Sequence, residues 1–312
     1  MTAPPTNVTV RNALVLGLGT SGRAAARLLL HEGARVTVID AATHPELVER
    51  AAQLEARGAL VRLGSEALPD GDFDLCVVSP GIPAGSPWVR DMQSRGTVLQ
   101  SELAFGASRC RCPILAVTGT NGKSTFVKLC AESLQQAGLR AQAAGNYGTA
   151  LCDVAGQSGA LDWVVAEVSS FQMEFPAGFH PRVGVLLNVQ PDHQDRHPDP
   201  NAYFRLKTRM FDAMSGTDTA IVPANLSDRV RNATTGRPRW LSFGDTPAAD
   251  VHYAAGYVQS ADERARIDLR DTFLANTVLG PSAAAAAAAL QACGCEPAGL
   301  VPAARGFEPL PH

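Results

Sequence analysis

The 312-residue sequence has few aromatic residues, few charges and no excess of basic side chains. Aromatic residues make up 6% and charged residues 18%, and the formal net charge is −3. A positive field of the kind that grips a nucleic-acid backbone is missing, so we expect no nucleic-acid partner. No apolar run approaches the roughly 18 residues that cross a bilayer, so we expect no membrane partner either.

The chain also lacks the features of a secreted protein. Its first residues, MTAPPTNVTV, have neither the positive charge nor the apolar stretch of a signal peptide. The seven cysteines are scattered, and the pairs Cys110/Cys112 and Cys293/Cys295 do not have the spacing of a zinc knuckle or a redox C-x-x-C motif. Free thiols fit a reducing compartment, and we expect a cytoplasmic protein.

Apolar residues make up 46% of the chain, which is enough for packed cores, and the length corresponds to about two domains. In the first hundred residues, an apolar run at 13–18, a β-branched run at 36–39 and a further expected strand at 75–79 alternate with helical patterns such as 21–31. This alternation predicts an α/β fold with a doubly wound parallel sheet.

A second α/β series begins at 114–118, after a stretch with cysteine and arginine that interrupts the pattern. Further strands are expected at 163–168, 183–189 and 219–222, and helices at about 124–137, 201–214 and 281–293. The last helix contains seven consecutive alanines, the best helix former. We place the domain boundary before this series, which gives domains 1–109 and 110–312.

The first glycine-rich loop, Gly17-Leu18-Gly19-Thr20-Ser21-Gly22, fits the pattern G-x-G-x-x-G. It follows an expected strand and opens an expected helix, and Asp40 ends the next strand. This context is typical of a dinucleotide-binding turn, where glycines admit a phosphate to the backbone and the helix N-terminus attracts it. Taken alone, the motif leaves open an NAD-dependent oxidoreductase and a tight turn without a ligand.

The second glycine-rich loop, Gly119-Thr120-Asn121-Gly122-Lys123-Ser124-Thr125, is the stronger signal. A strict Walker A motif requires a glycine where Val117 stands. The chemistry is nevertheless that of a phosphate loop. Successive N–H groups around 119–122 can form an anion nest, Lys123 can neutralise phosphates and the Ser124 hydroxyl can reach Mg²⁺.

Three other polar residues stand at informative places. Glu167 interrupts an apolar strand, where a carboxylate is costly unless it is paired or bound to a metal. His193 follows the strand that ends at Asn188, in the crevice where open α/β sheets bind ligands. Lys207 lies on the next expected helix, where an exposed lysine is the ordinary interpretation.

Together these motifs resemble the Mur ligases. The segments 119–125, Gly145-Asn146, 166–172 (AEVSSFQ), 188–197 (NVQPDHQDRH) and Lys207 have the order and approximate spacing of that family. The resemblance covers nearly the whole chain. The first glycine loop, the turn Ser79-Pro80-Gly81-Ile82-Pro83 and the segment 169–172 are most similar to the branch that joins D-glutamate to UDP-N-acetylmuramoyl-L-alanine.

The resemblance implies a three-domain enzyme. A Rossmann-like first domain holds the uridine nucleotide-sugar rather than NAD, a P-loop-type ATPase domain with a parallel sheet holds ATP and Mg²⁺, and a third domain holds the amino acid. The implied contacts to the UDP-sugar are Leu18, Gly19, Thr20, Ser21, Asp40, Gly81, Asn146, Gln172 and His193. The implied contacts to ATP are Gly119, Thr120, Asn121, Gly122, Lys123, Ser124 and Thr125.

The implied reaction is carboxylate activation in peptidoglycan precursor synthesis. ATP phosphorylates the muramoyl-L-alanine carboxylate, and the amine of D-glutamate attacks the acyl phosphate. The catalytic residues would be Lys123, Glu167, His193 and Lys207. Ser124 and Glu167 would hold one Mg²⁺, and His193 would hold a second together with Lys207, which is carbamylated in this family. The partners would be these small molecules only, and we expect a monomer.

Two departures from the family pattern stand near the end of the chain. The segment 272–282 lacks the usual His-Asn-x-x-Asn pattern near the adenine, and Asn276 is the nearest candidate. Leu310-Pro311-His312 resembles the start of the family's Leu-Pro-His-Arg motif, which precedes the third domain, so we expect a truncated, inactive form. The alternatives are a nucleotide-sugar and ATP-binding module without catalysis, another Mur-type or folate-type ligase, and an oxidoreductase, which leaves Lys123, Glu167 and His193 unexplained.

Overall fold

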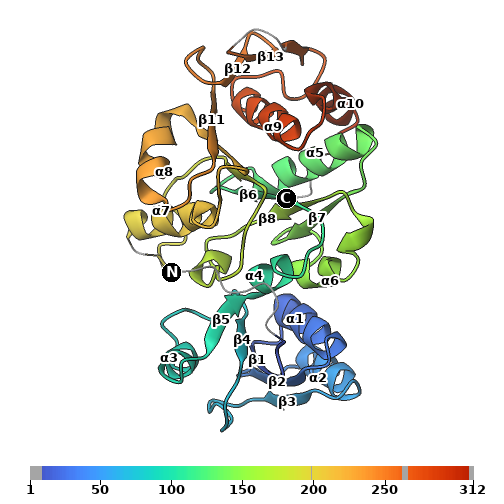
Figure 1. Ribbon diagram of the computed structural model, residues 1–312, viewed down its shortest axis with the longest axis vertical. Helices are drawn as coiled ribbons and strands as arrows, with labels where there is room; N and C mark the ends of the chain where they lie inside the picture. Colours follow the sequence, from blue (N-terminus) through green and yellow to red (C-terminus); the bar gives the residue numbers. More distant parts are fainter. Residues whose placement is uncertain (1–8, 198, 262–265, 309–312) are drawn as a thin grey trace. The chain divides into compact units, whose positions relative to one another are not determined.

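The computed structural model describes residues 9–197, 199–261 and 266–308 (Figure 1). The chain forms two compact units. Unit 1 comprises Met1–Arg111, Thr149–Gln157 and Ser170–Phe179, and unit 2 comprises Cys112–Gly148, Ser158–Ser169 and His180–His312. The prediction of domains 1–109 and 110–312 does not include the two later segments of unit 1.

Unit 1 contains a five-stranded parallel sheet in the order β3-β2-β1-β4-β5. Its strands are β1 (Asn12–Leu16), β2 (Arg35–Asp40), β3 (Leu60–Leu63), β4 (Leu75–Val78) and β5 (Val98–Ser101). Its helices are α1 (Thr20–His31), α2 (Pro45–Glu55), α3 (Pro87–Ser94), α4 (Glu102–Ala107) and α6 (Leu151–Ala155). The strand order reverses between β1 and β4, which confirms the doubly wound fold and places its switch point beside the first glycine loop.

The central strand β1 is buried on both faces, as its apolar run predicts. Ala13 and Val15 of β1 face a core shared with α1 and α2, while Leu14 and Leu16 face a core shared with Met92 of α3. Successive side chains of a strand point to opposite faces, so a strand covered on both sides is apolar at every position.

Unit 2 contains a nine-stranded sheet in the order β14-β13-β12-β11-β10-β9-β6-β8-β7. The strands are β6 (Ile114–Thr118), β7 (Ala141–Gly145), β8 (Trp163–Glu167), β9 (Val183–Leu186), β10 (Thr219–Pro223), β11 (Arg239–Gly244), β12 (Val251–Ala254), β13 (Tyr257–Ser260) and β14 (Arg266–Asp268). From β7 to β12 the neighbours are parallel, as predicted, but β13 and β14 pair antiparallel. The turn before β13 is Ala255-Gly256, both at positive φ, and it lacks the Asn-Gly or Asp-Gly signal that announces such hairpins.

The helices of unit 2 are α5 (Lys123–Gln136), α7 (Pro200–Thr208), α8 (Ser227–Ala233), α9 (Gly280–Ala292) and α10 (Leu300–Arg305). Helices α5 and α9 contact each other on one face of the sheet (Figure 1). Residues 283–289 of α9, all alanine, are buried, and a side chain on Gly280 would collide with the Tyr253 ring. Small residues thus let α9 lie close to the sheet. The helix predicted at 201–214 ends at Thr208 and continues as the 3₁₀ turn Arg209–Phe211.

Candidate active site

The first glycine loop is a tight turn between β1 and α1. Gly17 has φ +87°, and a Cβ on Gly22 would lie 1.8 Å from the carbonyl oxygen of Gly17. The Ser79 hydroxyl, at the end of β4, donates to that same carbonyl at 3.0 Å. Glycine is therefore required at position 22, because any side chain would force the loop away from α1.

Asp40 shapes this loop from the end of β2. Its Oδ2 accepts a hydrogen bond from the Leu18 N–H at 2.7 Å, and its Oδ1 accepts one from the Ala42 N–H at 2.9 Å. Helix α1 starts without a side-chain cap among the described residues, and both Gly19 and Thr20 are exposed beside half-buried Ser21. An uncapped helix start with exposed N–H groups suits an anion such as a diphosphate.

The other predicted residues of unit 1 differ in their surroundings. The Leu18 side chain is buried, Gly81 is exposed on the turn after β4, and Gln172 is buried in the later segment Ser170–Phe179. The buried Leu18 can offer only its backbone to a ligand, whereas Gly81 is open to solvent.

In unit 2, Ser124 of the second glycine loop and Asn146, which follows β7, both contact Glu167. Glu167 ends β8 and is 2% exposed. The Ser124 hydroxyl donates to its Oε2 at 2.6 Å, and the Asn146 side-chain amide donates to its Oε1 at 2.9 Å. Two neutral donors satisfy the carboxylate without cancelling its charge, so the place suits a cation.

Lys207 is buried rather than exposed, contrary to the ordinary interpretation of a helix lysine. It is 2% exposed on α7, its ammonium donates to the Gly119 carbonyl at 2.7 Å, and its Nζ lies 4.6 Å from the centre of the Tyr203 ring. Burial, reinforced by repulsion from Lys123, lowers the pKa of Lys207 to about 7. A large fraction of its amine is therefore neutral and nucleophilic near pH 7.

His193 lies on the exposed loop after β9, at φ +51°. The backbone N–H of His193 donates to Asp192 Oδ1 at 2.8 Å, and the ring Nε2 of His193 lies 3.6 Å from Asp192 Oδ2. Its ring packs edge-on at 6.4 Å from the ring of Tyr203, the residue that also contacts Lys207. The structure thus brings His193 and Lys207 to the same tyrosine.

The oxygen atoms of Ser124 and Glu167 can be compared with the ligands that Mg²⁺, the metal implied by the sequence, prefers. In the described part of the chain, no group of three or more His, Cys, Asp or Glu residues is arranged to hold a metal. Mg²⁺ does not need such a group, because it keeps several waters and takes one or two protein oxygens with substrate phosphates. The hydroxyl of Ser124 and the carboxylate of Glu167 fit that requirement.

The loop contains contacts that sequence reasoning missed. Lys123 Nζ donates to the Thr120 carbonyl at 2.8 Å. Two of the N–H groups predicted to form an anion nest, those of Thr120 and Asn121, donate to the side chain of Asn188. The position of Asn188 at the carboxyl end of a parallel strand was the available signal.

The atypical segment before α9 uses its asparagine locally. Asn276 Oδ1 accepts from the N–H groups of Val278 and Leu279, and its amide donates to the Phe273 carbonyl at 2.8 Å. This side chain therefore shapes the approach to α9. Leu310-Pro311-His312 lies outside the described residues.

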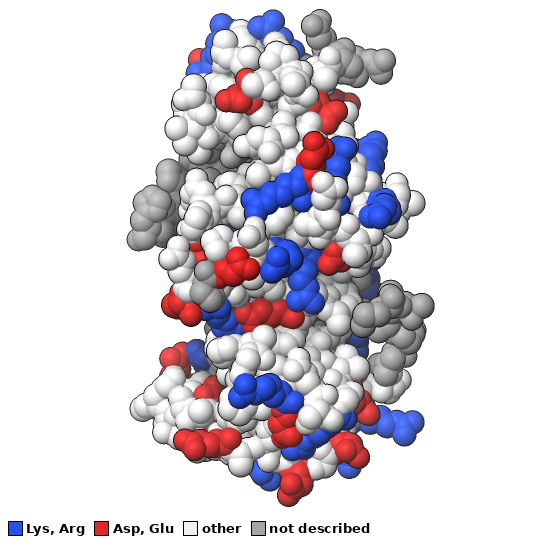
Figure 2. Space-filling model, turned by 90° about the vertical axis from the view of Figure 1, so that its left-hand side faces the viewer, with Lys and Arg blue, Asp and Glu red and all other residues white. Residues whose placement is uncertain are grey.

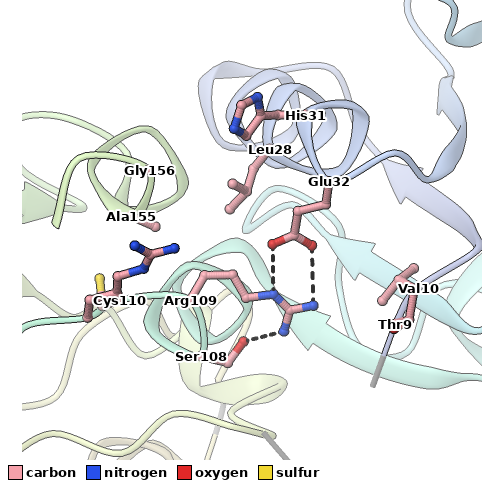
Figure 3. A pocket seen from close by; sticks show the side chains of 11 residues that line it. Thr9, Val10, Leu28, His31, Glu32, Ser108, Arg109, Cys110, Ala155 and Gly156 are labelled. Atoms are coloured by element: carbon pink, nitrogen blue, oxygen red, sulfur yellow. Dashed lines mark hydrogen bonds and ion pairs between the residues drawn. The ribbon is translucent and has the colours of Figure 1, made fainter. Parts of the chain in front are cut away.

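Unit 1 also has a groove of about 850 Å³ (Figure 3). It lies at the C-terminal end of α1, where Arg109 pairs with Glu32 at 3.0 Å. The glycine loop is at the opposite end of this helix, and no residue predicted from the sequence lines the groove. On the face shown in Figure 2, basic and acidic side chains are interspersed rather than gathered by sign.

Comparison with known proteins identifies the family. The profile of the Mur ligase middle domain matches residues 117–280, and that of the MurD-like N-terminal domain of Mur ligases matches residues 11–100. The chain belongs to the Mur ligase family. Members of this family are ATP-dependent ligases that form amide bonds.

Three curated relatives are all named UDP-N-acetylmuramoylalanine–D-glutamate ligase. Those from Geobacter metallireducens and Desulfosudis oleivorans are 33% and 34% identical and align with 97% and 99% of this chain. The one from Syntrophotalea carbinolica is 38% identical over 77% of the chain. The chain spans 53% of the Syntrophotalea protein and 68% of each of the other two.

Solved structures of Mur ligases share the fold. The UDP-N-acetylmuramate:L-alanyl-gamma-D-glutamyl-meso-diaminopimelate ligase from Neisseria meningitides aligns with a TM-score of 0.65 at 19% identity, over 97% of this chain and 99% of that chain. MurF from Thermotoga maritima, solved in complex with ADP, aligns with a TM-score of 0.54 at 13% identity, over 89% and 64%. Among the described residues, no helix has the length and apolar character needed to cross a membrane.

Proposed function

We propose that this chain carries the nucleotide-sugar and ATP sites of a ligase that joins D-glutamate to UDP-N-acetylmuramoyl-L-alanine. The observation that carries the proposal is the cluster of Ser124, Asn146 and Glu167 at the second glycine loop. The same loop contains Lys123, and Lys207 of α7 donates to its Gly119 carbonyl. An oxidoreductase has no use for this cluster. The identities of the amino acid and of the muramoyl substrate in this proposal come from the names of the relatives.

The first chemical step requires two anions, the substrate carboxylate and the γ-phosphate of ATP, to approach each other. Charge neutralisation therefore dominates this step. Lys123 leaves the Thr120 carbonyl, 2.8 Å away, and turns to the phosphates. Ser124 and Glu167 would hold Mg²⁺, which would neutralise further phosphate charge.

The second step is attack of the D-glutamate amine on the acyl phosphate, with release of phosphate. The buried, partly neutral amine of Lys207 could add CO₂ and release a proton to give a carbamate, and this anion together with His193 would hold a second Mg²⁺. Without that modification, an ammonium at this place would repel a metal. The reaction belongs to peptidoglycan precursor synthesis, and so to cell-wall biogenesis, and we assign it to the cytoplasm and to a monomer.

In the first domain, proposed as residues 1–109, the uridine diphosphate lies at the start of α1. Gly19, Thr20 and Ser21 offer backbone N–H groups there, and Leu18 contributes only backbone. Both oxygens of Asp40 already accept backbone N–H groups, so this residue supports the uridine site by fixing the loop. Gly81, Asn146, Gln172 and His193 are assigned to the muramoyl part, and the second domain is proposed as residues 110–312.

Isothermal titration calorimetry of this chain tests the proposal. UDP-N-acetylmuramoyl-L-alanine and MgATP should each bind, and NADH should not. Lys123→Ala should weaken MgATP binding, while Lys128→Ala, a lysine on the same helix that contacts Phe307 instead, should not. Binding of NADH without binding of the nucleotide-sugar would overturn the proposal, and an unchanged ATP affinity of Lys123→Ala would overturn the phosphate-loop assignment.

A further inference from the structure

Asn188 makes a two-sided contact with the phosphate loop. It follows β9, and its Oδ1 accepts the N–H groups of Thr120 at 3.0 Å and Asn121 at 2.9 Å. Its side-chain amide donates to the Asn121 carbonyl at 3.0 Å. The Thr120 N–H also reaches the backbone carbonyl of Asn188 at 3.2 Å. One side chain therefore satisfies two successive donors and one acceptor of the loop.

Gln190 repeats this attachment two residues later. Its N–H donates to the Thr120 hydroxyl at 3.0 Å, and that hydroxyl donates to the Gln190 carbonyl at 3.1 Å. The Asn121 side-chain amide donates to Gln190 Oε1 at 3.0 Å. The outer half of the loop, Thr120-Asn121, is thus fastened to 188–190 by both backbone and side-chain hydrogen bonds.

These contacts decide which N–H groups remain for phosphate. A backbone N–H that already donates to Asn188 gains little by turning to a phosphate, because the hydrogen bond that it gives up must be replaced. Helix α5 starts after Gly122 at φ +79°, and no side chain caps it in the described part of the chain. The first N–H groups of a helix have no partner within the helix and favour anions. Residues 122–125 therefore offer the open donors.

We propose that Asn188 is a positioning residue whose hydrogen bonds to Thr120 and Asn121, here called the splint, hold the phosphate loop in place. The splint directs the ATP phosphates to the N–H groups of 122–125 rather than to those of Thr120 and Asn121. The inference rests on the proposed ATP site and adds a residue to it. The splint holds the loop in one conformation before nucleotide arrives, so binding does not have to order the loop.

Amide hydrogen exchange measured by NMR tests the splint without any nucleotide. In the ligand-free wild-type chain, the amides of Thr120 and Asn121 should be protected. Asn188→Ala should abolish the protection of Asn121 and reduce that of Thr120, whose N–H keeps the backbone carbonyl of residue 188 as an acceptor. On titration with MgADP, the amides of 122–125 should shift strongly, while those of Thr120 and Asn121 should stay protected. Rapid exchange of both amides in the wild type, or their becoming the most strongly shifted signals, would overturn the inference.

Nucleotide affinity provides the second readout. Asn188→Ala should weaken MgATP binding by roughly tenfold or more, because the hydrogen bonds of the Asn188 side chain to Thr120 and Asn121 that order the loop are lost. The affinity for UDP-N-acetylmuramoyl-L-alanine should not change. Asn201→Ala is the matched control, since Asn201 contacts Arg229 on α8 and should leave ATP affinity unaltered. Equal ATP affinity of wild type and Asn188→Ala would contradict the inference.

Asn188→Asp covers the case in which the alanine variant does not fold. It keeps the acceptor for both N–H groups but loses the donor to the Asn121 carbonyl and adds a negative charge beside the phosphates, so its MgATP affinity should also fall. An unchanged affinity would count against the splint. If the wild type itself bound no MgATP, the proposed function would fail, and the ligand-free exchange of Thr120 and Asn121 would still decide on the splint.

Discussion

Replacing Glu102 with glutamine should remove a pH-dependent destabilisation of unit 1. Glu102 begins α4 and is 1% exposed. Its Oε1 accepts the Cys152 N–H at 2.7 Å, whereas its Oε2 has no hydrogen-bond partner in the described residues. Burial, opposed by the hydrogen bonds of Cys152 and supported by the nearby Asp153, raises the pKa of this carboxyl to about 7. Glutamine has the shape of the protonated acid and cannot ionise.

The size of the effect follows from the two pKa values. The folded-state pKa of about 7 lies above the ordinary value of 4.5 for a glutamate, so the folded state binds the proton more tightly. Stability is therefore highest below pH 4.5 and falls as the pH rises through 7. With about 1.4 kcal/mol per pKa unit, this group costs about 1 kcal/mol at pH 5 and about 3 kcal/mol at pH 8. The advantage of Glu102→Gln should thus grow by about 2 kcal/mol over this range.

Urea unfolding at several pH values measures this difference. Trp88 is the tryptophan of unit 1, and Trp163 and Trp240 belong to unit 2. Trp163→Phe and Trp240→Phe are therefore introduced into every protein, so that the fluorescence of Trp88 reports on the unfolding of unit 1. Asp153 pairs with Arg27, and the thiols of Cys110 and Cys152 also lie nearby, but all of these stay the same in both proteins. Glu32→Gln, a partly exposed carboxylate paired with Arg109, is the control and should keep the wild-type slope. If the free energy of unfolding of Glu102→Gln changed with pH in parallel with that of the wild type, the reasoning would be refuted.

Three further predictions concern the two loops and the buried lysine. Gly22→Ala should destabilise unit 1 by about 3 kcal/mol or more, seen in the same urea assay, because its Cβ would stand 1.8 Å from a backbone oxygen; an unaltered midpoint would contradict this. Ser124→Ala should weaken the Mg²⁺ dependence of ATP binding in calorimetry without lowering affinity for the nucleotide-sugar, and an unchanged Mg²⁺ dependence would remove Ser124 from the metal site. Lys207→Met should be more stable than wild type near pH 7 and should lose about 3 kcal/mol of that advantage by pH 10. The reason is that the folded-state pKa of Lys207, about 7, lies below its ordinary value of 10.5, so the wild type gains stability as the pH rises between these values. If the free energy of urea unfolding changed equally with pH in both proteins, Lys207 would titrate normally.

Much of the fold was predictable because it depends on local patterns. The strands β1, β4 and β6 are mainly apolar runs and β2 is rich in β-branched residues. Both glycine loops stand between a strand and a helix. Val117 departs from the Walker A pattern harmlessly, because its side chain is buried in the core beneath the loop.

What escaped prediction depends on contacts between residues far apart in the sequence. The contact of Asn188 with Thr120 joins residues 68 positions apart. The place of Asn188 at the end of a strand signals a site, but it does not identify this partner. The burial of Lys207 under the loop likewise follows from how α7 packs. The segments Thr149–Gln157 and Ser170–Phe179 return to unit 1 although they lie between strands of unit 2, and strand alternation alone cannot show such a return.

The most direct test of the proposed function is phosphate release by the protein at its natural length. ATP, Mg²⁺, UDP-N-acetylmuramoyl-L-alanine and D-glutamate are supplied together and then omitted one at a time. The account predicts that phosphate appears only when all four are present, with D-glutamate not replaceable by L-glutamate. Phosphate release that does not depend on the nucleotide-sugar, or none with all four present, would contradict it.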